Sequence, residues 1–200
     1  MTDKYMYLDK RVMKTKQELK VAIITLMQQK KYKDITISDV IAMAKISRGT
    51  FYNHYRSKEE LLLELLDDVV LDLVQAYQQP YKKYRRFTLN DVLPSSVEIF
   101  DHVYKHSNFY TTIINSDISP HFQARLIDVL NKIALQDYII RNRKINSELY
   151  AGYQAFVITG MIIEWVRSGY RFTPSYMAQQ LMEIVKLPGH QSLERIKGET

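Results

Sequence analysis

The side chains best suited to chemistry lie close together in this sequence, between Thr36 and Lys58. The segment from Arg48 to Tyr55 reads Arg-Gly-Thr-Phe-Tyr-Asn-His-Tyr. If it is helical, Phe51 and Tyr55 lie four residues apart and share an inward face, so the polar side chains between them point outward. Outward donors and acceptors of this kind suit phosphate groups and the edges of bases, and arginine matches guanine in particular. The segment therefore predicts recognition of DNA, with Arg48 as the strongest candidate for a base contact.

Two short helices and a turn must hold these side chains. Thr36 with Asp39 forms a capping-box pattern that starts the first helix, and Ser47 can cap the second. The helices are about eight and seven residues long with a turn of about three to four residues between them, which is the size of a helix-turn-helix. The second helix of that motif enters the major groove. Gly49 allows a sugar-phosphate chain to approach closely, and the backbone N–H groups that begin both helices are phosphate sites themselves.

The distribution of charge supports this interpretation. The net charge is +6, and residues 1–60 hold thirteen Lys and Arg against seven Asp and Glu, whereas the rest of the chain holds fifteen of each. The whole excess therefore lies in the first third. Such asymmetry indicates a basic module that meets a polyanion, joined to a neutral body with another task. A solvated basic face without function is the alternative that charge alone leaves open.

The chain as a whole predicts an all-α fold of about nine helices, three of them in the basic N-terminal third. Six glycines and five prolines interrupt the sequence, and apolar residues recur at spacings of three and four. The expected helices are 10–31, 36–44, 47–55, 58–79, 89–105, 107–115, 119–141, 147–169 and 174–186. We expect an N-terminal arm and helix-turn-helix domain over 1–57, a linking helix over 58–79, an effector-binding and dimerisation domain over 80–187, and a loose tail over 188–200.

Several classes of protein are excluded by composition. There are no cysteines, so disulfides and thiolate sites are absent, and the charged first fifteen residues leave no room for a signal peptide. The fifteen uncharged residues over 149–163 are fewer than the roughly 20 that a membrane-spanning helix needs. No phosphate-binding glycine loop, nucleophile elbow or paired carboxylates occur. We expect a cytoplasmic protein that is not an enzyme, has no cofactor and does not bind a membrane.

The run Thr-Phe-Tyr-Asn-His-Tyr-Arg-Ser-Lys-Glu-Glu-Leu over 50–61, with Ile-Thr-Ile-Ser-Asp-Val over 35–40, resembles the DNA-binding domain of TetR-family transcriptional regulators. The resemblance implies an all-helical homodimer on a palindromic operator in double-stranded DNA, with three helices for DNA and the rest for ligand binding and dimerisation. One position departs from the family pattern, because Lys45 stands where glycine is usual in the turn. A lysine there must adopt a positive φ or reshape the turn, at a cost of about 1 kcal/mol.

Carried over by position, the resemblance implies a set of DNA-binding residues: Thr36, Ser38, Arg48, Gly49, Thr50, Tyr52, Asn53, His54 and Lys58. Three of them have an alternative role. Tyr52 can be a packing residue, His54 can stabilise the end of its own helix through the helix dipole, and Lys58 can be a solvated residue of the next helix.

The C-terminal part is similar to a domain found in one TetR subgroup, through Phe109–Asn115, Phe122–Leu126, Gly160–Trp165 and Gly169 with Thr173-Pro174. That subgroup includes regulators of dihydroxyacetone kinase genes, some of which activate through a protein partner. The resemblance implies a regulator, by default a repressor, that an unknown small-molecule effector releases from DNA. The alternative is a co-regulator whose C-terminal domain binds a protein partner instead.

Two further sets of residues follow from the apolar character of the C-terminal helices. A dimer interface is expected at small and apolar residues of the helix over 147–168, where packing within one subunit is the alternative: Ala151, Gly152, Ala155, Thr159, Gly160 and Ile162. An effector pocket is expected at large side chains, although aromatic residues at helical spacing are often plain core: Phe100, Tyr104, Phe109, Tyr110, Ile113, Phe122, Leu126, Tyr153, Phe156 and Trp165.

One pair of histidines has a spacing that a metal ion could use. His102 and His106 lie four residues apart on an expected helix, with Asp101 adjacent. The sequence offers no other clear ligand and no cysteine. The pair therefore reads as two surface histidines, and no metal site is predicted.

Overall fold

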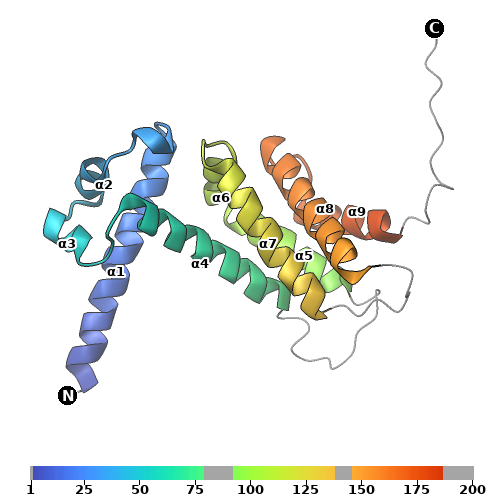
Figure 1. Ribbon diagram of the computed structural model, residues 1–200, viewed down its shortest axis with the longest axis horizontal. Helices are drawn as coiled ribbons and strands as arrows, with labels where there is room; N and C mark the ends of the chain where they lie inside the picture. The colour runs from blue at the N-terminus through green and yellow to red at the C-terminus, as the bar shows by residue number, and fades with distance from the viewer. Residues whose placement is uncertain (1, 79–91, 138–145, 187–200) are drawn as a thin grey trace, which may run out of the picture.

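The computed structural model describes residues 2–78, 92–137 and 146–186, and within these ranges every regular element is a helix. The expected all-α fold is confirmed, with nine α-helices and one short 3₁₀ helix, η1, among the described residues (Figure 1). The expected tail over 188–200 and the ends of three expected helices, at 79, 89–91 and 138–141, lie outside them. The helices are α1 Thr2–Met27, η1 Tyr32–Asp34, α2 Ile37–Ala44, α3 Arg48–Tyr52, α4 Lys58–Gln78, α5 Val92–Lys105, α6 Ser107–Ile114, α7 Ser119–Asp137, α8 Ser147–Arg167 and α9 Pro174–Lys186.

The N-terminal helices form a small head at one end of the molecule (Figure 1). The apolar stripe of α1 is buried at Leu19 and Ile23, and α2 and α3 add Val40 and Phe51 to the same core. Helix α1 ends at Met27, four residues earlier than expected, because the N–H groups of the next turn bond back to the carbonyl of Leu26. Helices α1, α2 and α3 therefore form a three-helix unit. In Figure 1, α3 lies at the end of this unit that is far from the body.

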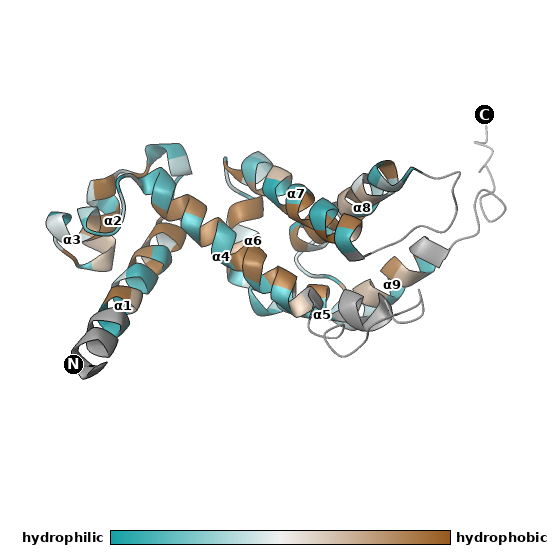
Figure 2. Ribbon diagram, turned by 60° about the horizontal axis from the view of Figure 1, so that its bottom comes forward, coloured by the Kyte–Doolittle hydropathy of each residue, from teal (hydrophilic) through white to brown (hydrophobic). Residues whose placement is uncertain are grey.

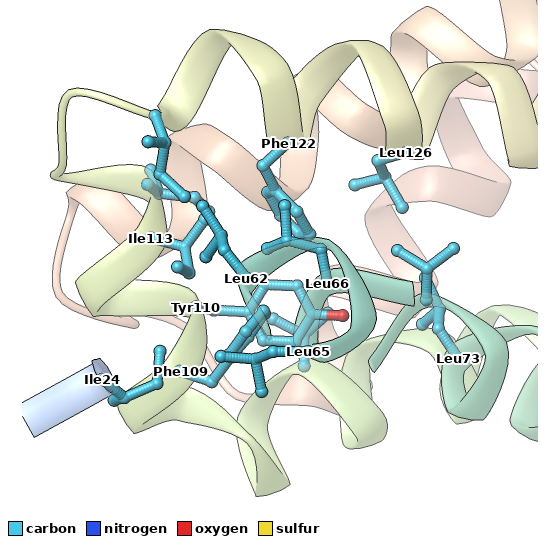
Figure 3. Packing of buried hydrophobic residues seen from close by; sticks show 14 of the residues in the cluster. Ile24, Leu62, Leu65, Leu66, Leu73, Phe109, Tyr110, Ile113, Phe122 and Leu126 are labelled. Atoms are coloured by element: carbon cyan, nitrogen blue, oxygen red, sulfur yellow. The ribbon is translucent and has the colours of Figure 1, made fainter. Parts of the chain in front are cut away.

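Helix α4 runs from the head into the body. Apolar and polar residues alternate along it, as expected of an amphipathic helix (Figure 2). Leu62, Leu66 and Leu73 of α4 are buried against aromatic residues of α6 and α7, of which Tyr110 and Phe122 are fully enclosed (Figure 3). The core therefore continues without interruption from the head along α4 to the body.

A second connection joins head and body near η1. The carboxylate of Asp117, in the loop between α6 and α7, accepts hydrogen bonds from the backbone N–H groups of Tyr32, at 2.9 Å, and Lys33, at 3.1 Å. Burial acts against it, but these N–H groups hold the pKa of Asp117 below its ordinary value. The side chain of Gln28, after α1, donates to Asn108 of α6 at 2.7 Å. The head is thus held to the body at two places, along α4 and at this loop.

The body pairs α7 with α8 and α5 with α9. Ala155, Ile162 and Trp165 of α8 are buried, and the indole N–H of Trp165 donates to the carbonyl of Phe172 at 2.9 Å. Helix α8 is followed by Gly169 with a φ of 72°, which is the positive φ that glycine takes readily after a helix. By length and composition alone α8 is apolar enough to cross a membrane, but core helices of soluble proteins pass the same test, and this one has a buried face.

Candidate nucleic-acid interface

The start of α2 is fixed by the capping box that the sequence predicts. The hydroxyl of Thr36 accepts from the N–H of Asp39 at 3.1 Å and donates to the carboxylate of Asp39 at 2.8 Å. Lys30 adds an ion pair to the same carboxylate at 2.7 Å, and this partner lowers the pKa of Asp39 below its ordinary value. The hydroxyl of Thr36 is thereby engaged within the head. Ser38, two residues after Thr36, is exposed.

The turn between α2 and α3 keeps its usual shape despite the lysine. Lys45 takes the left-handed conformation, with φ 55° and ψ 40°, so the first of the two expected outcomes is the observed one. The N–H of Ile46 donates to the carbonyl of Ile41 at 3.1 Å, which is the long-range bond of a Schellman closure. The side chain of Lys45 is exposed beside the start of α3. The turn is therefore compatible with a helix-turn-helix.

Helix α3 separates its apolar and polar faces as expected. Phe51 and Tyr55, just after the helix, are fully buried, with 0% and 1% of their surfaces exposed. On the outward side the guanidinium of Arg48 lies over the ring of Tyr52, 5.8 Å from its centroid, and 46% of Tyr52 is exposed. Tyr52 is thus not a core residue. The other outward residues are exposed or half-buried: Gly49, Thr50, Asn53 and His54.

The recognition segment is shorter than the expected helix over 47–55. Ser47 caps α3 by accepting from the N–H of Thr50 at 3.0 Å, and α3 ends at Tyr52. Beyond Tyr52 the N–H of His54 donates to the carbonyl of Phe51, three residues earlier, which is the spacing of a 3₁₀ turn and not of an α-helix. The hydroxyl of Tyr55 donates to Glu64 of α4 at 3.1 Å, which turns the chain toward α4. Asn53 and His54 therefore lie on a turn beyond the helix.

Lys58, predicted as a phosphate ligand, contacts groups within the head. Its ammonium donates to the carbonyls of Ile35 at 2.6 Å and Tyr32 at 3.0 Å, and it lies 4.5 Å from the centroid of the Tyr32 ring. In this structure, which contains no DNA, these carbonyls take up the donors of the ammonium. The physical reason is that η1 folds back onto the start of α4 and leaves carbonyls that need a donor. Lys58 joins α4 to the preceding loop.

Other basic side chains of the head form no ion pair among the described residues. They are exposed: Lys31, Lys33, Lys45 and Arg56. By contrast, Lys16 and Lys20 of α1 point at α4, where they contact Glu64 at 2.8 and 2.6 Å. The excess positive charge lies in the first third of the chain, where the sequence indicated the basic module. Which of these lysines lack an ion pair depends on the carboxylates that α4 supplies.

Comparisons with known proteins agree with this geometry. The model of "Bacterial regulatory proteins, tetR family" matches residues 21–65, and that of "Transcriptional regulator C-terminal region" matches residues 90–187. The first match covers the segment from α1 to the start of α4, and the second covers the body. This chain belongs to the TetR family. The resemblance that the sequence suggested is confirmed, and it extends over both parts of the molecule.

Several TetR-family proteins are similar over most of this chain. The uncharacterized HTH-type transcriptional regulator YxbF of Bacillus subtilis is 22% identical over 84% of this chain and 44% of its own length. A solved structure of a TetR-family regulator from Syntrophomonas wolfei has a TM-score of 0.71 at 18% identity, and covers 88% of this chain and 98% of that one. The chain thus spans less than half of YxbF but nearly all of the solved relative. These relatives are regulators of transcription and not enzymes, as expected.

The subgroup suggested by the C-terminal part also appears. The HTH-type dhaKLM operon transcriptional activator DhaS of Lactococcus lactis is 37% identical over 30% of this chain and 32% of its own length. A solved structure of the dihydroxyacetone kinase operon activator DhaS has a TM-score of 0.60 at 20% identity, and covers 86% of this chain and 93% of that one. The body of this TetR-family chain therefore shares its fold with that regulator.

Most of the expected effector-binding residues are core residues in this TetR-family body. The rings of Phe109 and Tyr110 each pack edge-on against Phe122, with centroids 5.8 Å apart. Seven of the ten are buried: Phe100, Phe109, Tyr110, Ile113, Phe122, Leu126 and Trp165. Tyr104, Tyr153 and Phe156 are instead exposed. An open pocket of about 280 Å³ lies where α8 meets α9, and of the ten only Trp165 lines it.

The expected dimer residues divide between two faces of α8. Four of them are buried inside the subunit, where α8 packs against α7: Ala151, Ala155, Thr159 and Ile162. Gly152 and Gly160 point to the other side, and a Cβ built at either glycine meets nothing within 4 Å. Two residues expected in the pocket, Tyr153 and Phe156, lie on that outward side. These four residues thus follow the alternative that the sequence left open, packing within one subunit.

The histidine pair differs from its interpretation as two surface residues. His102 is buried, with 6% of its surface exposed, and the adjacent Asp101 is exposed and turned away. The carboxylate near the pair comes from Asp72 of α4. No sequence pattern links Asp72 to the pair, because 30 residues separate it from His102.

Proposed function

We propose that this chain is a sequence-specific regulator of transcription that binds a palindromic operator as a homodimer, with α3 of each subunit in the major groove. The observation that carries the proposal is the outward face of α3. Its polar side chains are exposed or half-buried on a short helix whose other face is anchored by Phe51, and the exposed Lys45 and Arg56 flank this segment in the sequence. Side chains so exposed can reach base edges, and the cations can meet the flanking phosphates.

The contacts are assigned from exposure and position. Arg48 reads a base, since arginine bonds two acceptors of guanine at once, and its contact with Tyr52 orients it. Thr50, Asn53 and His54 contact base edges or phosphates beside it, while Gly49 allows the strand to approach. Ser38 and Lys45 hold phosphates at the start of α2 and in the turn. Thr36 contributes its helix N-terminus, and Lys58 is left out of the set.

The second copy is placed on the outward side of α8. Three large apolar residues there are exposed on one stripe with Gly160, namely Leu149 at 77%, Tyr153 at 56% and Phe156 at 64%. Their spacing of three and four residues puts them on one helical face, opposite the face on α7. Exposed apolar stripes of this size mark interfaces between subunits. Together with α9 this face would form a four-helix bundle across the dimer axis.

The body provides the regulatory input, and residues 80–187 are assigned to it. A small-molecule effector that favours one spacing of the two heads would release the dimer from DNA, so repression is the default sign. The pocket between α8 and α9 is the candidate site for such a molecule. The likeness to DhaS, named an activator, favours a second candidate in which the body binds a protein partner and activates. Either regulator works in the cytoplasm.

Binding to DNA is tested with the chain's own upstream intergenic DNA against random DNA of equal length, across a salt series. Arg48→Ala should weaken specific binding by about 1–3 kcal/mol and relax preference at one base position. Lys132→Ala is the matched control, because it removes one exposed cation of α7, far from α3 along the chain. Equal losses on specific and random DNA for Arg48→Ala would contradict its role in reading a base.

The dimer is tested by Gly160→Leu with light scattering and operator binding. Because nothing in the same subunit lies near a Cβ at this position, the variant should fold normally and fail to dimerise. Leu135→Glu, at an exposed apolar residue of α7, is the control that should leave the dimer intact. A Gly160→Leu protein that remains dimeric would move the interface away from α8.

A further inference from the structure

Three side chains that can ligate a metal meet where α4 packs against α5. The Nε2 atoms of His102 and His106 each lie 3.2 Å from Oδ2 of Asp72, and the two imidazole rings are 4.5 Å apart between centroids. One ligand atom from each of the three lies within 4.8 Å of the others. His102 and His106 are one turn apart, and Asp72 comes from the neighbouring helix.

These distances are those of ligands around one ion. Bonds of about 2.0–2.2 Å from a divalent metal to imidazole nitrogen and carboxylate oxygen place neighbouring ligand atoms about 2.8–3.6 Å apart, from octahedral to tetrahedral angles. The observed separation between each nitrogen and the carboxylate oxygen falls in this range. Two histidines and one carboxylate on one side of an ion also leave positions open on the other side.

The polar groups are incompletely satisfied without an ion. His102 makes the hydrogen bond to Asp72, whereas Nε2 of His106 is buried and has no hydrogen-bond partner. A buried acceptor or donor without a partner is costly and calls for an explanation. That nitrogen lies 3.2 Å from the same carboxylate oxygen as Nε2 of His102 and makes no hydrogen bond to it. An ion between the three atoms satisfies all of them.

The surroundings of His102 suit a metal ligand. Its second nitrogen, Nδ1, lies 3.3 Å from the hydroxyl of the buried Tyr110, so it can donate a hydrogen bond there while Nε2 faces the metal. The side chain of Asp72 is 52% exposed, which opens a path for an ion.

We propose that Asp72, His102 and His106 bind one divalent first-row transition metal, such as zinc, with positions left open for water or an anionic ligand. The set contains no thiolate, so it suits borderline cations that accept imidazole and carboxylate. The site lies between α4 and α5 and involves none of the residues proposed to contact DNA. Metal binding and DNA binding can therefore be measured and can fail separately.

The first measurement is metal binding by the full chain, without a histidine tag and after removal of metals with a chelator. Zinc titrated in competition with a chromophoric chelator should bind at one equivalent per chain. Cobalt(II) should give visible absorption bands of a nitrogen- and oxygen-ligated ion. Zinc should also raise the thermal midpoint, since an ion that binds only the folded state stabilises it.

Variants separate a metal site from a hydrogen-bond chain of Asp72, His102 and Tyr110. His106→Gln leaves that chain intact but removes a ligand, and should weaken zinc binding at least about tenfold, as should Asp72→Asn. His121→Gln, an exposed histidine of α7, is the matched control and should bind like the unaltered protein. Far-ultraviolet circular dichroism checks that each variant is folded. No stoichiometric binding, or equal affinity in His106→Gln, would overturn the proposal.

Discussion

The two ends of α4 are held by different kinds of contact. At the head end, Glu64 receives the ammonium groups of Lys16 and Lys20 and the hydroxyl of Tyr55, and Lys20 also contacts Asp68 at 2.5 Å. The side chain of Lys20 is only 10% exposed. Burial would lower its pKa, but the two carboxylates raise it above the ordinary value. The head end is an ionic cluster around one nearly buried ammonium.

At the body end the acidic residues of α4 have looser partners. Asp67 contacts Arg125 of α7 at 2.8 Å, with both side chains nearly half exposed. Asp72 faces two histidines, one of them neutral through burial. Exposed ion pairs contribute little, whereas buried and fully partnered charges are costly to disturb. The difference indicates that charged contacts hold the head end of α4 more firmly than its body end.

Of the variants that test the difference between the two ends of α4, Glu64→Gln should have the largest effect on stability. The change leaves the buried ammonium of Lys20 with one carboxylate, and because 32% of the Glu64 side chain is exposed, the loss should be about 2 kcal/mol of unfolding free energy. Urea unfolding followed by circular dichroism measures it. Asp128→Asn, at an exposed pair with Lys132 of α7, should change stability by less than about 0.5 kcal/mol. Similar losses in both would mean that the head end is no more firmly held than the surface.

Acid should weaken the head end through the same residue. Burial by itself would raise the pKa of Glu64. Its hydrogen bonds and ion pairs with Lys16 and Lys20 outweigh burial and lower that pKa from an ordinary 4.5 to about 2. Between these values the unfolded chain binds more protons, so the contribution of Glu64 is full above pH 4.5 and is lost as the pH falls toward 2. After allowance for solvent screening it is about 1–2 kcal/mol. Thermal midpoints across this window should fall less steeply in Glu64→Gln, and parallel slopes would contradict this.

The loop connection between head and body should be weaker than the ionic cluster. Asp117→Asn exchanges the charged acceptor of two backbone N–H groups for a neutral one, and should cost about 1 kcal/mol. Asp101→Asn, at an exposed carboxylate of α5, is the matched control. Hydrogen exchange at the amides of Tyr32 and Lys33 should increase in the first variant alone. Unchanged exchange there would show that the loop does not depend on Asp117.

The smallest effect is expected in the turn of the head. Lys45→Gly relieves a side chain held at φ 55°, and the gain, partly offset by glycine's greater freedom when unfolded, should be about 0.5 kcal/mol. Lys45→Ala keeps the strain and removes only the charge, so its stability should not rise. If Lys45 holds a phosphate, both variants should bind DNA more weakly and with a shallower salt dependence. A gain in stability in both variants would rule out relief of strain as the cause.

The head was predictable because its signals are local. The capping box of Thr36, the cap at Ser47 and the inward pair Phe51 and Tyr55 each depend on residues within four positions. The same locality made the strain at Lys45 foreseeable from a missing glycine. The carbonyl partners of Lys58 are not predictable in this way. They lie about 25 residues earlier, in a loop whose return to α4 no short-range pattern encodes, so the sequence alone indicates only an exposed cation.

The body was predictable as helices but not as surfaces. Helix α8 is apolar on two faces. Periodicity alone therefore could not distinguish its inward residues, such as the buried Ala155, from its outward residues, such as the exposed Gly160. Aromatic spacing likewise does not distinguish a packed core from a pocket, as the enclosed Phe122 shows. The third member of the histidine cluster, Asp72, depends on the register between α4 and α5. Such registers follow from the packing of whole helices.

The position of Trp165 has a practical consequence for studying the molecule in solution. It is the only tryptophan of the chain, and it is buried in the body beside Phe100, Tyr104 and Tyr170. Its emission therefore reports on the body alone, while the head has only tyrosines. A ligand that enters the pocket touching Trp165 should shift or quench that emission directly. The unmodified protein thus carries an optical probe in the body, and the head carries no tryptophan.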